Sequence, residues 1–240
     1  MADVWGVNEM PNLVADIGCG TGLSVRPWAA NAKNIIGIDP SEELLTIARS
    51  NNICDNISFS KGYGSNTGLA DNSVDIVTAM CSIHWMEPKS TLAEIQRILN
   101  ENGILILCSY ELSPTSKFLE VEHELFILKK KIGSLTLKYG LEKDIYFYKD
   151  IDFFNFVVNE ETFLYNRYFY FSETIYWDIN DYLGWIYTLG NVQKLRNDIG
   201  LTDEEIGISK LSEVLKKNFQ SQRQPLFLSW KVFLFRHQIR

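Results

Sequence analysis

The sequence predicts an α/β protein built on a doubly wound, mostly parallel β-sheet. Short apolar segments alternate with amphipathic segments through the first 110 residues, a pattern that is typical of repeated strand–helix units. A glycine-rich turn follows the first apolar segment, at the place where open α/β sheets bind their ligands. The chain has 240 residues, 46% of them apolar, so it can bury one substantial core. One embellished α/β domain or two small domains both suit this length.

The first half of the chain predicts five strands and three helices. Apolar runs that end in turn residues indicate strands, whereas apolar residues at helical spacing, such as Leu92, Ile95 and Leu99, indicate helices. The polar segment 61–72 is expected to be a loop. The strands are expected at 13–17, 35–38, 57–59, 74–79 and 104–109, and the helices at 22–31, 41–51 and 89–99.

After residue 111 this rhythm changes and aromatic residues become dense. Residues 146–187 contain 17 of the 31 aromatic residues of the chain. A long strand is expected at 165–176, and an alternating apolar segment at 226–235 predicts a final strand. Helices are expected at 115–133, 178–189 and 202–218, the last of these as one or two helices.

Composition and charge exclude several classes of function. A net charge of −7 and a pI near 5.1 disfavour nucleic acid or an anionic membrane as a bulk electrostatic partner. We see no signal peptide and no apolar run of transmembrane length, so we expect a soluble cytoplasmic protein. The four cysteines are far apart in the sequence, which predicts neither a metal site nor a disulfide framework. They are Cys19, Cys54, Cys81 and Cys108.

The glycine turn after the first strand contains the strongest motif. Asp16 precedes Gly18, Gly20 and Gly22, which alternate through the turn. A dinucleotide-binding fingerprint needs its third glycine one residue later, where this chain has Leu23, and the phosphate-loop motif is absent. We expect the glycines to let the backbone approach a ligand, with the following helix directing its N-terminus toward the turn. Asp16 either orients this turn or is an ordinary strand-end acid.

Two further segments extend the predicted ligand site. Asp39 ends the second strand, 21 residues after Gly18, where a carboxylate can accept hydrogen bonds from ribose hydroxyls. The alternative is that Asp39 caps the next helix, with Pro40 as its first residue. After the third strand, the loop residues Tyr63, Gly64 and Ser65 are candidates for stacking and backbone hydrogen bonds to a base.

The loop that follows the fourth strand is the third candidate ligand segment. Met80 and Cys81 leave the carboxyl end of that strand, and His84 and Trp85 follow in the same loop. This is where open α/β sheets place ligands. His84 is either a packed, hydrogen-bonded residue or a functional contact, and Trp85 either forms a wall of the site or supports the core.

These motifs together resemble those of the class I S-adenosylmethionine-dependent methyltransferases. The segments Leu23–Ala29, Thr67–Leu69, Ser82–Pro88 and Ser229–Lys231 are similar to the type 11 family, in a branch related to the trans-aconitate methyltransferases. The resemblance covers nearly the whole chain from residue 13. It implies a seven-stranded Rossmann-like sheet whose antiparallel last strand lies between strands five and six, with a helical, aromatic cap.

The resemblance also implies a domain organisation. Residues 1–111 would be the S-adenosylmethionine-binding half of the α/β domain, 112–225 the remaining helices, the sixth strand and the substrate cap, and 226–240 the final strand of the same sheet. Relatives usually have helices before the first motif, whereas about a dozen residues precede it here. Either the chain is short at this end, or the lid forms differently, or cofactor affinity is reduced. Many relatives also have an acid after the third strand, and this chain has none there.

The implied function is methylation of a small organic acceptor by S-adenosyl-L-methionine, with S-adenosyl-L-homocysteine as product. We expect O-methylation of a carboxylate or a hydroxyl, with His84 as the candidate base because its usual pKa suits neutral pH. The alternative is a non-catalytic, cofactor-binding subunit; a nicotinamide dehydrogenase is disfavoured by Leu23. The oligomeric state is left open. The expected cofactor contacts are Asp16, Gly18, Gly20, Gly22, Asp39, Pro40, Tyr63, Gly64, Ser65, Met80 and Cys81, and the expected substrate contacts are His84, Trp85, Tyr182, Trp185 and Tyr187.

Overall fold

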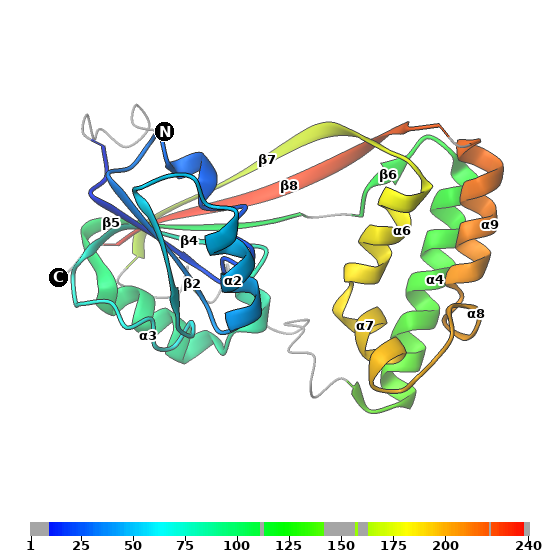
Figure 1. Cartoon of the computed structure of the whole chain (residues 1–240), viewed down its shortest axis with the longest axis horizontal. Coiled ribbons are helices and arrows are strands. Elements are labelled where there is room, and N and C mark those ends of the chain that lie inside the picture. The colour runs from blue at the N-terminus through cyan, green and yellow to red at the C-terminus, as the bar shows by residue number, and fades with distance from the viewer. Residues whose placement is uncertain (1–9, 111–112, 142–156, 158–162, 221, 238–240) are drawn as a thin grey trace. The chain divides into compact units, whose positions relative to one another are not determined.

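The computed structural model describes residues 10–110, 113–141, 157, 163–220 and 222–237, and Figure 1 shows the chain. The chain divides into two compact units. The first unit lies within Met1–Ser109, Tyr148–Tyr170 and Lys231–Arg240, and the second lies within Tyr110–Phe147 and Phe171–Trp230. Among the described helices, none combines the length and the apolar character needed to cross a bilayer.

The predicted doubly wound sheet is confirmed. Its strand order is β3-β2-β1-β4-β5-β8-β6, and the pairs from β3 to β5 are parallel. The last strand, β8, lies next to β5, as the resemblance implied, and it pairs antiparallel with the short β6 and also pairs with β7. The strands are β1 (Leu13–Ile17), β2 (Asn34–Asp39), β3 (Ile57–Lys61), β4 (Val74–Met80), β5 (Leu99–Tyr110), β6 (Thr115–Ser116), β7 (Phe163–Trp177) and β8 (Gln224–His237).

Side chains alternate across the sheet of the first unit and so build a core on each face. Ala15 and Ile17 of β1 join a cluster that contains Ile95 of α3 (Pro88–Ile98). Val14, the residue before Ala15, joins a second cluster that contains Leu45 of α2 (Glu42–Ser50). Successive residues of a strand point to opposite faces of the sheet. Because neighbouring β1 residues pack in different clusters, α3 and α2 lie on opposite faces.

The prediction of a helix at 22–31 is wrong. Residues 20–25 form turns, and only the 3-10 helix η1 (Arg26–Trp28) follows them. Its hydrogen bonds span three residues, from Trp28 N to Val25 O at 3.0 Å and from Ala29 N to Arg26 O at 3.1 Å. In a helix that began at residue 22, Pro27 would lie beyond the first turn, where it has no N–H to donate and its ring crowds the preceding turn. No helix N-terminus therefore stands behind the glycine turn.

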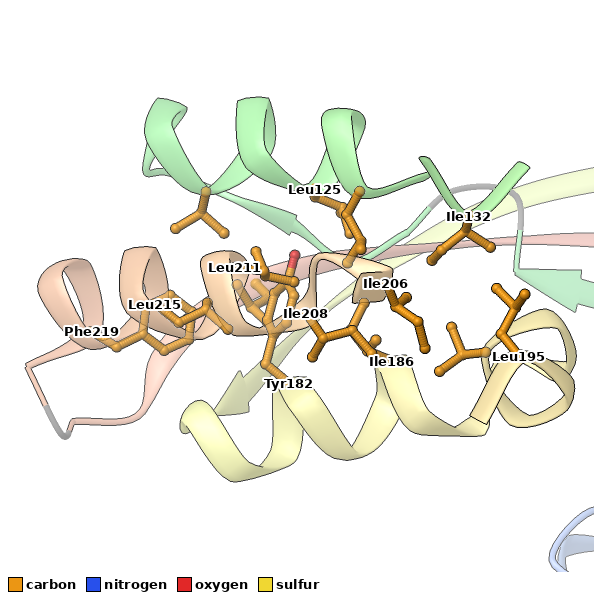
Figure 2. Packing of buried hydrophobic residues seen from close by; sticks show 14 of the residues in the cluster. Leu125, Ile132, Tyr182, Ile186, Leu195, Ile206, Ile208, Leu211, Leu215 and Phe219 are labelled. Carbon is orange, nitrogen blue, oxygen red and sulfur yellow. The ribbon is translucent and has the colours of Figure 1, made fainter. Parts of the chain in front are cut away.

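The second unit is mainly helical and has its own core. Its helices are α4 (Leu119–Lys138), α6 (Ile179–Thr188), α7 (Gly190–Asn197), α8 (Asp203–Ile206) and α9 (Ile208–Phe219). Figure 2 shows apolar side chains of these helices pointing toward one another, among them Leu125, Tyr182, Ile186 and Leu211. This burial of apolar surface is the main force that holds the helices together.

Most predicted elements after residue 111 are confirmed, with changed ends. The segment 202–218 forms two helices because Gly207, with a φ of +105°, ends α8 and starts α9. The helix expected from 115 begins at Leu119, since Thr115 and Ser116 pair with β8. The α7 helix was not predicted, because α6 ends at Thr188 and Gly190 already starts the next helix.

Candidate functional site

A cavity of about 450 Å³ opens at the carboxyl ends of β1, β2, β3 and β4 in the first unit. This edge includes the point between β1 and β4 where the strand order reverses, the usual ligand position in an open α/β sheet. The volume is within the range of small-molecule pockets. The cavity is lined by Ile17, Gly18, Gly20, Asp39, Pro40, Leu44, Gly62, Tyr63, Gly64, Ser65, Cys81, Ser82, Trp85, Met86, Glu87 and Thr91.

The glycine turn forms the floor of this site and is fastened to β2. Gly18 N and Cys19 N both donate to Ile38 O, at 2.7 and 3.1 Å. Gly20 N donates to Asp39 Oδ2 at 2.9 Å. Gly18 and Gly20 have φ values of +74° and +53°, which a side chain disfavours. These φ values show that the glycines shape the turn, and a close approach of this backbone to a ligand stays a prediction.

Gly22 has a packing role in the same turn. A Cβ atom at Gly22 would lie 2.8 Å from Cζ of Phe59 and 3.3 Å from Cβ of Ala48. Gly22 is not one of the cavity-lining residues, so its backbone fits the turn against β3 and α2. A direct contact between Gly22 and a cofactor stays a prediction.

Asp39 is one of two acidic residues that line the cavity, the other being Glu87. Its side chain is buried, with Oδ2 accepting from Gly20 N and Oδ1 accepting from Ser41 N at 2.9 Å. The alternative that Asp39 caps the next helix is wrong, because Ser41 is the N-cap of α2 and accepts from Leu44 N. Each carboxylate oxygen keeps a free acceptor site, so Asp39 can still bind a ligand hydroxyl.

Asp16 lies below the turn and is not among the cavity-lining residues. It is fully buried, and it accepts hydrogen bonds from Ser24 Oγ at 2.5 Å and from the hydroxyl of Thr78. Burial raises the pKa of Asp16 to about 6, against the effect of these two hydroxyl donors, and the nearby Asp39 raises it further. Asp16 thus joins the glycine turn to β4, which supports the interpretation that it orients the turn.

The raised pKa of Asp16 predicts a specific pH dependence of stability. The native carboxyl has a pKa of about 6 and the unfolded one about 3.8, so the native state binds its proton more tightly. The stability of the native protein relative to an Asp16→Asn variant is therefore greatest below pH 3.8 and falls as the pH rises through 6. Urea denaturation of both proteins between pH 4 and 7.5 measures this. A difference in unfolding free energy that does not change with pH would contradict it.

The loop after β3 forms one wall of the cavity. Tyr63 and Asn66 exchange backbone hydrogen bonds of 3.0 Å, which closes a tight turn around Gly64 and Ser65. The Tyr63 side chain is 57% exposed, so it is available for stacking. A Cβ at Gly64 would lie 2.6 Å from the sulfur of Met86, so a side chain there would require the Met86 side chain to move.

The loop after β4 forms the opposite wall. Cys81 has a φ of +55°, an uncommon conformation for a non-glycine residue that places it in the cavity lining. Trp85, in the 3-10 helix η2 (Ile83–Trp85), also lines the cavity and is 49% exposed. Met80 and His84 are not cavity-lining residues. The His84 ring lies 5.1 Å from that of Trp85, and burial lowers the pKa of His84, so its imidazole is neutral at pH 7.

A family model described as a methyltransferase domain matches residues 15–107. These residues are therefore similar to a methyltransferase domain. The matched segment runs from β1 into β5, and it contains the glycine turn, Asp39 and both walls of the cavity.

Curated relatives of the chain are named as methyltransferases with different acceptors. The chain is 31% identical over 143 residues to the ubiquinone/menaquinone biosynthesis C-methyltransferase UbiE of Campylobacter jejuni, covering 56% of this chain and 60% of that enzyme. It is 34% identical over 94 residues to the malonyl-[acyl-carrier protein] O-methyltransferase of Pectobacterium atrosepticum, covering 38% of this chain and 36% of that enzyme. The chain therefore spans less than two thirds of the length of each relative.

Solved structures share the fold at low sequence identity. The YcgJ protein of Bacillus subtilis superposes with a TM-score of 0.60 at 14% identity, covering 100% of this chain and 98% of that one. Phosphoethanolamine N-methyltransferase 2 of Haemonchus contortus, solved in complex with S-adenosyl-L-methionine, gives a TM-score of 0.54 at 14% identity. That match covers 99% of this chain and 51% of the other. At these identities the likeness concerns the fold alone.

The predicted substrate residues after residue 180 lie in the second unit, whereas the cavity lies in the first. Tyr182 is fully buried in the core of that unit (Figure 2). Its ring lies edge-on to that of Trp185, with centroids 5.7 Å apart. Tyr187 donates its hydroxyl to Asp203 Oδ2 at 2.6 Å. In the structure these three residues have packing and hydrogen-bonding roles, and substrate contacts by them stay predictions.

Several cavity residues of the first unit were not predicted from the sequence. Ser82 donates to Ile17 O at 2.6 Å beneath Gly18, and Met86 and Thr91 face Gly64. Glu87 caps α3 by accepting from Ser90 N at 2.7 Å. A proline right after Glu87 signals the helix start. We find no local sequence signal for the other three, because their positions depend on contacts between segments that are distant in the chain.

Proposed function

We propose that this chain is an S-adenosyl-L-methionine-dependent methyltransferase that releases S-adenosyl-L-homocysteine. The observation that carries the proposal is Asp39, whose buried carboxylate joins the glycine turn and lines the cavity at the carboxyl end of the sheet. A carboxylate in this position can accept hydrogen bonds from both hydroxyls of a ribose. The methyltransferase domain match over residues 15–107 includes this site and supports the same cofactor.

The remaining cavity residues fit the other parts of such a cofactor. Gly20 leaves open space in the lining, since a Cβ there would meet no atom within 4 Å. Tyr63 belongs to the loop after β3, which would face the adenine ring. Its side chain is exposed, so the tyrosine ring is free to stack on the base. When bound, the cofactor supplies a methyl group on a sulfonium centre. The contribution of the chain is to align acceptor, methyl and sulfur and to exclude water, effects that can supply about 7–11 kcal/mol of rate enhancement.

For the acceptor, we propose a small organic molecule that is methylated on oxygen, within the branch related to the trans-aconitate methyltransferases. A carboxylate acceptor needs no general base, whereas a hydroxyl acceptor loses a proton. His84 is suited to take that proton, because burial lowers its pKa and leaves a neutral imidazole at pH 7. The curated relatives include both a C-methyltransferase and an O-methyltransferase, so the acceptor atom needs a direct experiment.

One observation favours a second candidate, a cofactor-binding subunit without catalysis. His84, the proposed base, is not among the residues that line the cavity. In such a subunit the cavity binds the cofactor while methyl transfer requires residues of another protein. Cofactor binding without turnover across a panel of carboxylates, phenols and amines would support this candidate.

Calorimetric titration of the chain with S-adenosyl-L-homocysteine and, separately, with NAD tests the proposal. We expect saturable binding of S-adenosyl-L-homocysteine only, and an affinity at least about tenfold lower in Asp39→Ala, because a charged hydrogen-bond acceptor is lost. Glu42→Ala is the control, since Glu42 lies on the outer surface of α2 and pairs there with Arg49. Binding of NAD alone, or of neither ligand, would contradict the proposal. Transfer of a labelled methyl group to acceptors then separates the two candidates.

A further inference from the structure

Thr91 has a buried hydroxyl that the described part of the protein leaves without a hydrogen-bond partner. Its side chain is 1% exposed, and Oγ1 makes no hydrogen bond with any described residue. A threonine inside a helix usually donates to the carbonyl four residues earlier. In α3 that carbonyl, of Glu87, accepts from Thr91 N at 3.1 Å, and the Thr91 hydroxyl is directed elsewhere. A buried polar group without a partner is uncommon and needs an explanation.

The position of the Thr91 hydroxyl explains why it has no partner within the described part of the protein. Thr91 lines the cavity, close to the loop after β3. A Cβ at Gly64 would lie 3.0 Å from Thr91 Oγ1, so the buried hydroxyl lies directly beside the backbone of Gly64 in the cavity lining. Met86 closes the other side, with its sulfur 2.6 Å from the same Cβ position. The hydroxyl therefore lies between the Met86 side chain and the backbone of Gly64.

The two carboxylates that line the cavity already accept hydrogen bonds from other groups. Glu87 also lines the cavity, but its carboxylate accepts from Lys89 N, Ser90 N and Ser90 Oγ as the cap of α3. Asp39 is held at the end of β2 by Gly20 and Ser41. The loop residues Tyr63, Gly64 and Ser65 carry no carboxylate. A ligand group bound beside Gly64 would thus meet a neutral hydroxyl and backbone groups.

We propose that the Thr91 hydroxyl recognises the amino edge of the adenine by accepting a hydrogen bond from its exocyclic amine. This inference rests on the proposed function, because it assigns one part of the S-adenosyl cofactor to one corner of the cavity. Asp39 binds the ribose at the end of β2, and the base extends along the sheet edge to the loop after β3, where Thr91 lies. The amine gives the hydroxyl its missing hydrogen-bond partner. The same hydrogen bond would therefore strengthen binding of the cofactor and favour a base with an amino group over one without it.

The test compares two ligands across three proteins. The ligands are S-adenosyl-L-homocysteine and its purine analogue, in which hydrogen replaces the 6-amino group. The proteins are the wild type, Thr91→Val, which keeps the shape and loses the hydroxyl, and Thr91→Ser, which keeps the hydroxyl. We expect calorimetry to show about a tenfold preference of the wild type for the amino ligand. Thr91→Val should bind the amino ligand about tenfold more weakly and prefer neither, whereas Thr91→Ser should retain most of the preference.

Thermal unfolding without ligand separates this role from a structural one. Thr91→Val removes a buried hydroxyl that lacks a partner, so we expect a melting temperature equal to or above that of the wild type. A Thr91→Val variant that melts lower and binds both ligands more weakly by the same factor would overturn the inference, as would an unchanged preference for the amino ligand. In both cases wild-type binding of S-adenosyl-L-homocysteine would leave the proposed function standing. A wild type that binds neither ligand would overturn both.

Discussion

Gly18→Ala is expected to lower the free energy of unfolding by about 3 kcal/mol, the sum of a backbone and a packing effect. Gly18 has a φ of +74°, where an L side chain is strained. The new Cβ would also lie 2.5 Å from Cβ of Ser82 and 2.9 Å from its Oγ. Ser82 cannot move aside easily, because its hydroxyl donates to Ile17 O at 2.6 Å in the adjacent strand. Urea denaturation at pH 7 gives the difference.

Gly20→Ala is the matched control in the same turn. Gly20 also has a positive φ, of +53°, but a Cβ there would meet nothing within 4 Å. We therefore expect only the backbone cost, about 1 kcal/mol. The new methyl group would project into the cavity lining, so this variant should fold and yet bind S-adenosyl-L-homocysteine more weakly. Equal destabilisation by the two substitutions would show that the close contact of the new Cβ at position 18 with Ser82 does not lower the free energy of unfolding.

Much of the first unit could be predicted because its signals are local. The apolar runs of β1, β2 and β4 are buried on both faces, so their composition marks them without help from distant residues. The helix expected at 22–31 fails for a local reason too, since Pro27 lies where the helix interior would be. The α7 helix was missed because α6 and α7 are separated by only one residue, Leu189.

The candidate site was predictable only in part. Asp39 and the glycines are recognisable because the end of a strand and the spacing of glycines are visible in the sequence. The partners that hold them are not. Thr78 contacts Asp16 across 62 residues, and Ser82 contacts Ile17 across 65. Such contacts depend on the register between β1 and β4, which the sequence does not display.

Two buried polar groups near the cavity lower the stability of the protein that contains them. The pKa of Asp16 is raised to about 6 because its charged form is buried, and Thr91 Oγ1 lacks a partner among the described residues. Groups of this kind concentrate at functional sites, where a bound ligand or a required geometry compensates for them. Asp16 fixes geometry through Ser24 and Thr78, whereas we assign Thr91 to ligand recognition.

Glu94→Ala is expected to destabilise the first unit by about 3 kcal/mol, because it leaves buried donors and a guanidinium without their acceptor. The Glu94 side chain is 8% exposed and accepts from Thr67 N at 2.7 Å, from Thr67 Oγ1 at 2.6 Å, and from Arg97 Nε at 2.8 Å. Arg97 also donates to Leu69 O at 2.8 Å and pairs with Asp71. Glu94 thus fastens the loop after β3 to α3. Glu42→Ala is again the control, since Glu42 is 54% exposed and such pairs contribute about 0–1 kcal/mol.

The pH dependence of this effect distinguishes a charge network from simple packing. Burial alone would raise the pKa of Glu94, but the hydrogen bonds from Arg97 and Thr67 outweigh it and lower the pKa to about 2 from an ordinary 4.5. The native carboxylate therefore stabilises the fold above pH 4.5, and this contribution is lost as the pH falls from 4.5 toward 2. Urea denaturation at pH 7 and pH 3 should show the gap between wild type and Glu94→Ala shrinking at the lower pH. An equal gap at both values would mean that Glu94 acts through its volume, and the loop after β3 would then be held by packing rather than by charge.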